Sequence, residues 1–369
     1  MTTPRHRIRS PYMEWAKLHS HARFNLANSG VASVPLAKLR ARLEELELSA
    51  AGAYGYEPLQ ERLARKCNVT PECVVAATGT SLANHLALAA LVDPGDEILV
   101  EHPTYELLLT TAQFLGARIR RFPRRFENNF IIDPRDIERA LTPQTRLIVL
   151  TNLHNPSAAR TEESVLREIG ELALRAGARV LVDEVYLEAV FGPPVRSAFH
   201  FGPHFVATSS LTKAYGLNGL RCGWILAAPE LAERMWRLND LFGVIPAHIA
   251  ELLSVMALDH LDEIARDACT LLAANRAILN RFFDSRSDLR AVRPEFGTVD
   301  FPRVLRGSAD RLCDLLREKY ESAVVPGRFF EMPEHFRIGI GGDTATLTEG
   351  LRRLGAALDE LARAGAAYT

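Results

Sequence analysis

The sequence predicts an α/β fold built on a mainly parallel sheet with helices on both faces. Short, mostly apolar runs alternate with helical patterns along the chain, and such runs are typical of strands buried on both faces. Regular alternation of strands with helices favours parallel pairing. Five runs are predicted to be strands: 97–100 (EILV), 146–150 (RLIVL), 179–182 (RVLV), 205–208 (FVAT) and 224–227 (WILA).

The helix predicted over 161–176 follows the second of these strands. Thr161 and Ser164 stand at its start, where they are placed to form a capping box.

The length of 369 residues is enough for about two domains. A helical stretch with little Gly or Pro covers residues 251–285, and strand-like pieces follow at 298–301 and 336–340 before a closing helix at 347–362. We therefore predict a large domain at 45–265 and a smaller α+β C-terminal domain at 266–369, preceded by a segment at 1–44.

Composition excludes several classes of protein. Lys plus Arg is 44 and Asp plus Glu is 45, so charge gives no reason to expect a nucleic-acid partner. No run approaches the roughly 20 apolar residues that span a membrane, and no apolar run follows the basic N-terminus, so we expect a cytoplasmic protein. The five cysteines are scattered without metal-ligand spacing, which indicates reduced thiols and no metal site.

Polar residues follow the predicted strands, at the sheet edge where ligands of parallel sheets bind. Lys213 comes after the strand at 205–208, behind Ser209, Ser210 and Thr212, and Arg221 follows among glycines. Lysine is the side chain that forms an imine with an aldehyde. Hydroxyls, an arginine and glycine-rich backbone suit a phosphate group. The alternative is an ordinary polar loop.

Two further residues end buried strands. Asp183 ends the strand at 179–182, where a carboxylate is costly without a partner, and a pyridinium nitrogen would be one. An ion pair at about 4 Å contributes roughly 4 kcal/mol at an effective dielectric of about 20. Asn155 follows the strand at 146–150 and could donate to a phenolate oxygen. The alternatives are a turn cap for Asp183 and an Asn-Pro turn for Asn155.

An anion site is also indicated before the helix predicted at 82–91. Gly79, Thr80 and Ser81 are small residues whose backbone N–H groups would be free at its N-terminus, although Thr80 could equally be a simple N-cap. Tyr105 follows the strand at 97–100 and could stack on an aromatic ring or belong to the core.

The ordered set of motifs resembles the fold-type I, class I/II aminotransferases of the aspartate aminotransferase superfamily. The resemblance runs from about Tyr54 to the last helix. The matching blocks are Gly79-Thr80-Ser81, Pro103-Thr104-Tyr105, Asn155-Pro156, Asp183-Glu184-Val185-Tyr186, Ser210-Leu211-Thr212-Lys213 and Gly219-Leu220-Arg221-Cys222-Gly223-Trp224. It implies the pyridoxal 5'-phosphate (PLP)-dependent transferase fold, with a seven-stranded sheet, and PLP as the cofactor.

The resemblance assigns a role to each matching residue. Lys213 forms the Schiff base with PLP and moves the proton at Cα, Asp183 pairs with the ring nitrogen, and Tyr105 stacks on the ring. Asn155 and Tyr186 bind the phenolic oxygen; Gly79, Thr80, Ser81, Ser210 and Arg221 hold the phosphate; Arg337 takes the substrate carboxylate, with Asn155 and Gly30 as further substrate contacts.

The sequence departs from the family pattern in two places. Ala158 stands where relatives often have Gly in an Asn-Pro-Thr-Gly turn. Alignment on Gly55 places Ala50 near the position of a tyrosine that relatives contribute to the neighbouring subunit's phosphate, and Tyr54 or Tyr56 could substitute for it.

The resemblance implies an aminotransferase that exchanges an amino group between an L-amino acid and a 2-oxo acid in a homodimer with shared active sites. It also places residues 1–44 against the small domain or a partner subunit. A second carboxylate-binding arginine has no strong match, so a dicarboxylic specialist is not supported. The alternatives are a PLP-dependent lyase or cyclase, capreomycidine-synthase-like or C–S-lyase-like, and more remotely a non-catalytic PLP-binding regulator.

Overall fold

A seven-stranded sheet forms the centre of the structure. The computed structural model describes residues 7–49, 53–192 and 194–366, so Ala50 and the extreme ends of the first and last predicted parts lie outside it. The strand order is β2 (Val74–Thr78), β8 (Cys222–Leu226), β7 (Phe205–Ser210), β6 (Arg179–Asp183), β5 (Thr145–Thr151), β3 (Glu97–His102) and β4 (Arg118–Pro123). Only β8 runs antiparallel to its neighbours in this sheet of the described chain, so the predicted mainly parallel sheet is confirmed.

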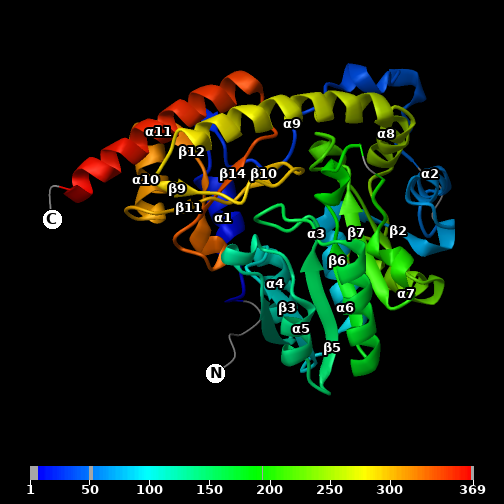
Figure 1. Cartoon of the computed structure of the whole chain (residues 1–369). Helices are drawn as coiled ribbons and strands as arrows, with labels where there is room; N and C mark the ends of the chain where they lie inside the picture. The colour runs from blue at the N-terminus through cyan, green and yellow to red at the C-terminus, as the bar shows by residue number, and fades with distance from the viewer. Residues whose placement is uncertain (1–6, 50–52, 193, 367–369) are drawn as a thin grey trace.

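Helices cover both faces of the sheet because successive strand residues point to opposite sides. On β5, Val149 joins the core beneath α3 (Gly79–Leu91) and α4 (Glu106–Phe114), whereas Ile148 joins the core beneath α5 (Pro134–Ala140) and α6 (Glu163–Ala176). Figure 1 shows these layers around the sheet. Both cores are apolar, which explains why the strands lack a polar face.

The start of α6 differs from the prediction. Its N-cap is Glu162, whose side chain makes no capping hydrogen bond. Thr161 is instead buried and accepts a hydrogen bond from Arg124 at 3.3 Å. The predicted capping box is therefore wrong, because the buried guanidinium of Arg124 occupies the threonine hydroxyl.

The C-terminal part is built on two long helices and three small sheets. The helical stretch predicted at 251–285 is divided at His260 (φ −113°, ψ 14°) into α8 (His248–Asp259) and α9 (Leu261–Asp284). Three strands form the antiparallel sheet β10 (Val299–Asp300), β14 (Phe336–Gly339) and β13 (Val325–Pro326). The remaining elements of this part are β9 (Leu289–Arg290), β11 (Arg303–Val304), α10 (Ala309–Lys319), β12 (Ser322–Ala323) and α11 (Thr344–Ala366).

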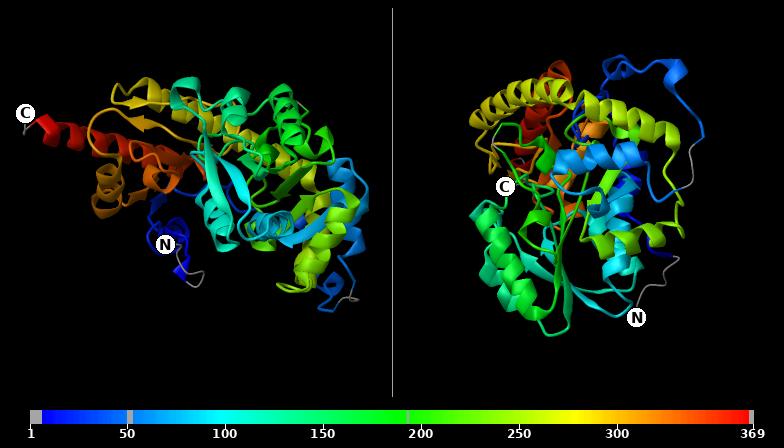
Figure 2. Two further views of the ribbon diagram at one scale, coloured as in Figure 1. Left: turned by 90° about the horizontal axis from the view of Figure 1, so that it is seen from below. Right: turned by 90° about the vertical axis from the view of Figure 1, so that its right-hand side faces the viewer.

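The N-terminal segment packs first against the C-terminal part and then runs to α8. It carries α1 (Pro11–Leu18) and β1 (Phe24–Asn25), which pairs with β12, and a 3-10 turn at Leu36–Leu39 that contacts α8 (Figures 1 and 2). This path agrees with packing against the C-terminal part, while the three-part division at 44 and 265 remains a prediction.

Short elements complete the chain. They are α2 (Glu57–Cys67), α7 (Pro229–Asn239), and the 3-10 turns Leu43–Glu45, Pro71–Cys73, Phe126–Asn128, Leu187–Ala189, Ala198–Phe201, Asn218–Leu220 and Gly327–Phe330. Within the described residues, every helix is too short or too polar to cross a membrane.

Candidate functional site

A cavity of about 570 Å³ lies where β5, β6 and β7 end. It is lined by most of the residues that the sequence singled out: Thr80, Ser81, Tyr105, Asn155, Asp183, Tyr186, Ser210, Lys213, Arg221 and Arg337. Gly30 and Gly79 stand just behind its wall. Gly30 packs on the backbone of Thr212 and Lys213, and Gly79 lies against the Arg221 guanidinium.

Lys213 follows β7 and projects into the cavity. Its Nζ donates a hydrogen bond to the Ser29 hydroxyl at 2.9 Å. Burial and, to a smaller extent, the cations of Arg337 and Arg221 lower the pKa of Lys213 to about 8, while Asp183 opposes them. A lysine with this pKa is partly a neutral amine near neutral pH, which is the form that acts as nucleophile and base.

Asp183 ends β6 on the side of Lys213. Its carboxylate accepts hydrogen bonds from Asn84 Nδ2 at 2.8 Å and from the backbone N–H of Val185 at 3.1 Å. Asn84 is itself fixed by the Thr208 hydroxyl, which donates to Asn84 Oδ1 at 2.6 Å. Burial raises the pKa of Asp183 to about 6 against these hydrogen bonds. A buried carboxylate held only by neutral donors favours a cationic partner in the cavity.

Another part of the cavity wall gathers groups that donate hydrogen bonds. Gly79 has a φ of +75°, and a Cβ there would overlap the Arg221 guanidinium, so only glycine allows this approach. The hydroxyls of Thr80 and Thr212 are buried and without a hydrogen-bond partner in the described part of the chain. Thr80 lies inside α3 and is not its N-cap. Free donors, a guanidinium and a helix N-terminus together suit an anion.

Arg337 on β14 closes the cavity from the C-terminal part. Its side chain is buried, with Nη1 donating to Asn155 Oδ1 at 2.9 Å and Nη2 donating to the Tyr12 hydroxyl at 2.8 Å. Its Nε has no hydrogen-bond partner among the described residues. Because this guanidinium has neutral partners only, it retains an unneutralised charge that a carboxylate would match.

Two tyrosines flank the site. Tyr105 lies edge-on to Tyr12, with ring centroids 5.9 Å apart, and its hydroxyl points to Met13 Sδ at 3.8 Å. Tyr186 is buried; burial raises its pKa to about 12, while Arg337 and a hydrogen bond with Ser29 pull it down. Both phenols are therefore protonated near neutral pH and can donate hydrogen bonds.

Helix α1 covers this cavity. Tyr12, Met13 and Trp15 all line the cavity. The helix is tied to α4 by the Ser10 hydroxyl, which donates to Glu106. The sequence analysis assigned this segment to packing with the small domain or a partner subunit and gave no role to Tyr12.

Asn84 was not singled out from the sequence, and Ser29 received no role there although its neighbour Gly30 did. Asn84 did carry a signal, because it is a buried amide within the otherwise apolar helix α3. Ser29 carried none, since its contact with Lys213 joins residues 184 positions apart.

The turn after Asn155 keeps its shape despite the missing glycine. Ala158 has a φ of 58°, and its N–H donates to the carbonyl of His154 at 2.6 Å. Ala158 thus adopts a left-handed conformation that is more usual for glycine.

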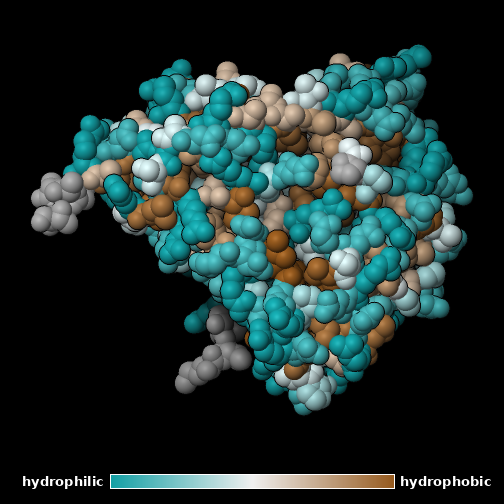
Figure 3. Space-filling view, viewed as in Figure 1, coloured by the Kyte–Doolittle hydropathy of each residue, from teal (hydrophilic) through white to brown (hydrophobic). Residues whose placement is uncertain are grey.

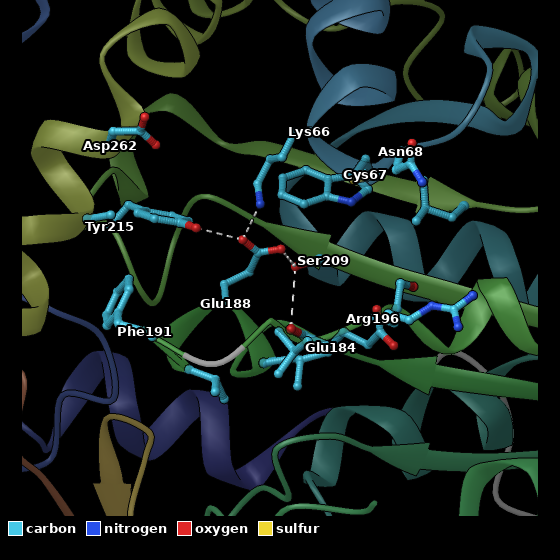
Figure 4. Close-up of a pocket in the computed structure, with 18 of the residues that line it drawn as sticks. Lys66, Cys67, Asn68, Glu184, Glu188, Phe191, Arg196, Ser209, Tyr215 and Asp262 are labelled. Carbon is cyan, nitrogen blue, oxygen red and sulfur yellow. Dashed lines mark hydrogen bonds and ion pairs between the residues drawn. The ribbon is translucent and has the colours of Figure 1, made fainter. Parts of the chain in front are cut away.

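A larger cavity of about 700 Å³ lies apart from Lys213. Glu184 and Ser209 line it. Ser209 precedes Ser210 on β7, and successive strand residues face opposite sides; Glu184 directly follows Asp183, the last residue of β6. Figure 4 shows Glu188 at its centre, paired with Lys66 Nζ at 2.6 Å and accepting a hydrogen bond from the Tyr215 hydroxyl at 2.8 Å. These charges satisfy one another, so the smaller cavity is the better candidate for chemistry.

Comparison with known proteins identifies the family of the chain. A family model described as aminotransferase class I and II matches residues 36–354. The chain is 30% identical to capreomycidine synthase of Streptomyces vinaceus, over 96% of this chain and 95% of that protein. It is 27% identical to an arginine–pyruvate transaminase of Pseudomonas aeruginosa, over 84% and 82%. The crystal structure of a PLP-dependent aminotransferase from Streptococcus suis superposes with a TM-score of 0.90 at 26% identity, covering 98% and 99%.

Proposed function

The chain belongs to the aminotransferase class I and II family of PLP-dependent, fold-type I enzymes, and from this premise we propose that it is an aminotransferase. It would move an amino group between an L-amino acid and a 2-oxo acid. The observation that carries the proposal is that an amine, a carboxylate and a guanidinium, those of Lys213, Asp183 and Arg337, line one cavity.

The residues of the cavity fit PLP. Lys213 would bind the aldehyde, Asp183 the ring nitrogen, and Tyr105 the ring face. Asn155 and Tyr186 would bind the phenolic oxygen. The phosphate would lie at Gly79, Thr80, Ser81, Ser210 and Arg221, where the unpartnered Thr80 hydroxyl within the described chain supports it. When bound, PLP supplies an aldehyde for the amine and a ring that takes up negative charge from Cα.

The chain's own groups would handle the substrate and the proton. Arg337 would hold the α-carboxylate with its planar fork, with Asn155 beside it. That grip fixes Cα, so Lys213 can remove and return its proton as a positioned base. The pKa of about 8 supports this role, because the amine gains and loses a proton with little cost near neutral pH. Trp15 on α1 would help to exclude water.

The remaining lining suits a substrate with one carboxylate. Arg221 and Arg337 are the arginines of this cavity within the described chain, and both already have roles. The rest of the wall near α1 carries Met13, Trp15, Asn25 and the imidazole of His21. A second carboxylate on the substrate would therefore lack a further arginine among the described residues of this wall, which does not support a dicarboxylic specialist.

A second candidate function is cyclisation or elimination from an amino acid. The 30% identity with capreomycidine synthase favours it, and both chemistries begin with removal of the Cα proton. One experiment separates the two: the PLP-loaded enzyme is mixed with arginine, chosen because of the transaminase relative, and with other amino acids. Transamination predicts that each reaction stops after one turnover and resumes when pyruvate is added. Sustained turnover without a 2-oxo acid would instead establish the lyase or cyclase.

We further propose a cytoplasmic homodimer with shared active sites. Large apolar side chains after α7 are exposed, Leu241 by 78%, Phe242 by 52% and Val244 by 61%, and contiguous exposed apolar surface marks interfaces. The face drawn in Figure 3 is mostly hydrophilic, with small separate hydrophobic areas. Tyr54 is 54% exposed and is the better placed of Tyr54 and Tyr56 to reach a partner. Sedimentation of the wild type and of Phe242→Glu tests this: a monomeric wild type contradicts it.

A further inference from the structure

Ser29 is in direct hydrogen-bonding contact with Lys213, although the family resemblance gives it no role. Its hydroxyl accepts a hydrogen bond from Lys213 Nζ at 2.9 Å, and its side chain is 5% exposed. Tyr186 shares the same hydroxyl. We propose that Ser29 is the residue that holds the free amine of Lys213 in the cavity and sets its protonation.

The backbone around Ser29 is fixed from both sides, so its hydroxyl has little freedom to leave Lys213. The Thr298 hydroxyl donates to the Ser29 carbonyl at 2.7 Å. The N–H of Val31 donates to the Lys213 carbonyl at 2.8 Å, and the N–H of Ala32 donates to the Gly341 carbonyl at 2.7 Å. This segment is therefore clamped between the Lys213 loop and the C-terminal part.

Close backbone approaches strengthen the clamp. A Cβ on Gly339 would overlap the carbonyl of Asn28, and a Cβ on Gly341 would overlap that of Gly30. Side chains at those positions would push the segment away from Lys213. Such precise placement is what a group must have to act on one amine.

The other charged groups that face Lys213 do not replace Ser29. Arg337 and Arg221 repel the ammonium, and Asp183, which attracts it, is engaged by Asn84 and the Val185 N–H. The Ser29 hydroxyl is the group that accepts directly from Nζ within the described chain. Removing it therefore destabilises the ammonium and lowers the pKa of Lys213.

The consequence for catalysis rests on the proposed binding of PLP at Lys213. Whenever the amine is not bound to the aldehyde, Ser29 would keep it within the cavity and partly protonated. The hydrogen bond between Lys213 and Ser29 is present in the cofactor-free protein. Its effect on the pKa of Lys213 can therefore be measured independently of which reaction, if any, the protein catalyses.

The test is the pKa of Lys213 in the cofactor-free enzyme, measured by competitive labelling with acetic anhydride and mass spectrometry of the Lys213 peptide. Ser29→Ala should lower this pKa by about one unit, since a hydrogen bond to a charged group is lost. Ser29→Thr keeps a hydroxyl and should leave it nearly unchanged.

Ser20→Ala is the matched control, because Ser20 lines the same cavity but donates to the Ala16 carbonyl at 2.6 Å. An unchanged pKa in folded Ser29→Ala, or an equal fall in Ser20→Ala, overturns the proposal. If Ser29→Ala does not fold, Ser29→Cys, which is a weaker acceptor, must show the same direction of shift, and no shift there also overturns it.

Discussion

Replacing Arg337 by lysine tests the proposed carboxylate site with the least disturbance. The positive charge stays, so the pKa of Lys213, which this cation helps to lower, should change little. What is lost is the planar fork, whose two Nη atoms now donate to Asn155 and Tyr12. Lysine can make only one of two hydrogen bonds to a carboxylate, and one such charged bond is worth about 1.5–3 kcal/mol. The Kd of the amino acid should therefore rise roughly 10- to 150-fold.

The assay is a spectral titration of the PLP-loaded variant with amino acid, with the Kd of PLP measured separately. Tyr12→Phe is the control, because it removes a neutral acceptor of Arg337 but keeps both Nη groups of the fork, so amino-acid binding should weaken far less than in Arg337→Lys. The reasoning is refuted if Arg337→Lys binds the amino acid as tightly as the wild type does. It is also refuted if PLP affinity falls as much as amino-acid affinity.

Three further predictions follow from the same geometry. Asp183→Ala should lower the pKa of Lys213 below about 8, because Asp183 raises it, and should slow Cα proton removal; a normal single-turnover rate in stopped-flow would count against this role. Asn84→Ala should raise the pKa of Asp183 above about 6 and cost roughly 1–3 kcal/mol in urea unfolding, since Asp183 and Thr208 each lose a partner; unchanged unfolding would argue against the network. PLP uptake by the cofactor-free enzyme should accelerate as pH rises through about 8 and then level off, because only the neutral amine reacts; a flat profile would contradict the lowered pKa.

The central sheet could be predicted from the sequence because its strands are buried on both faces. All five apolar runs are strands, and the rule that ligands bind beyond the strand ends predicts that Asp183, Asn155 and Lys213 lie together, as they do in the cavity. Two strands of the sheet were not predicted. The first strand, β2, is short and contains two alanines, which are weak strand formers. The edge strand β4 carries Arg118, Arg120 and Arg121, which suit an exposed edge.

Contacts between distant segments could not be predicted. The hydrogen bond from Arg337 to Tyr12 spans 325 positions, and that from Lys213 to Ser29 spans 184. Neither follows from periodicity or spacing, because each depends on how the N-terminal segment packs between the two parts of the chain. The predicted capping box at Thr161 also failed because of a tertiary contact: the hydroxyl of Thr161 accepts a hydrogen bond from the buried Arg124, 37 positions away.

The central claim, that PLP binds covalently to Lys213, is tested most directly by trapping the bound cofactor chemically and identifying the lysine that carries it. The purified enzyme is incubated with PLP, reduced with borohydride and digested, and the modified peptide is sequenced by mass spectrometry. We expect the phosphopyridoxyl group on Lys213 and the loss of the label in Lys213→Ala. A label on another lysine, or none on the wild-type protein, would contradict the proposal that this cavity is a PLP site.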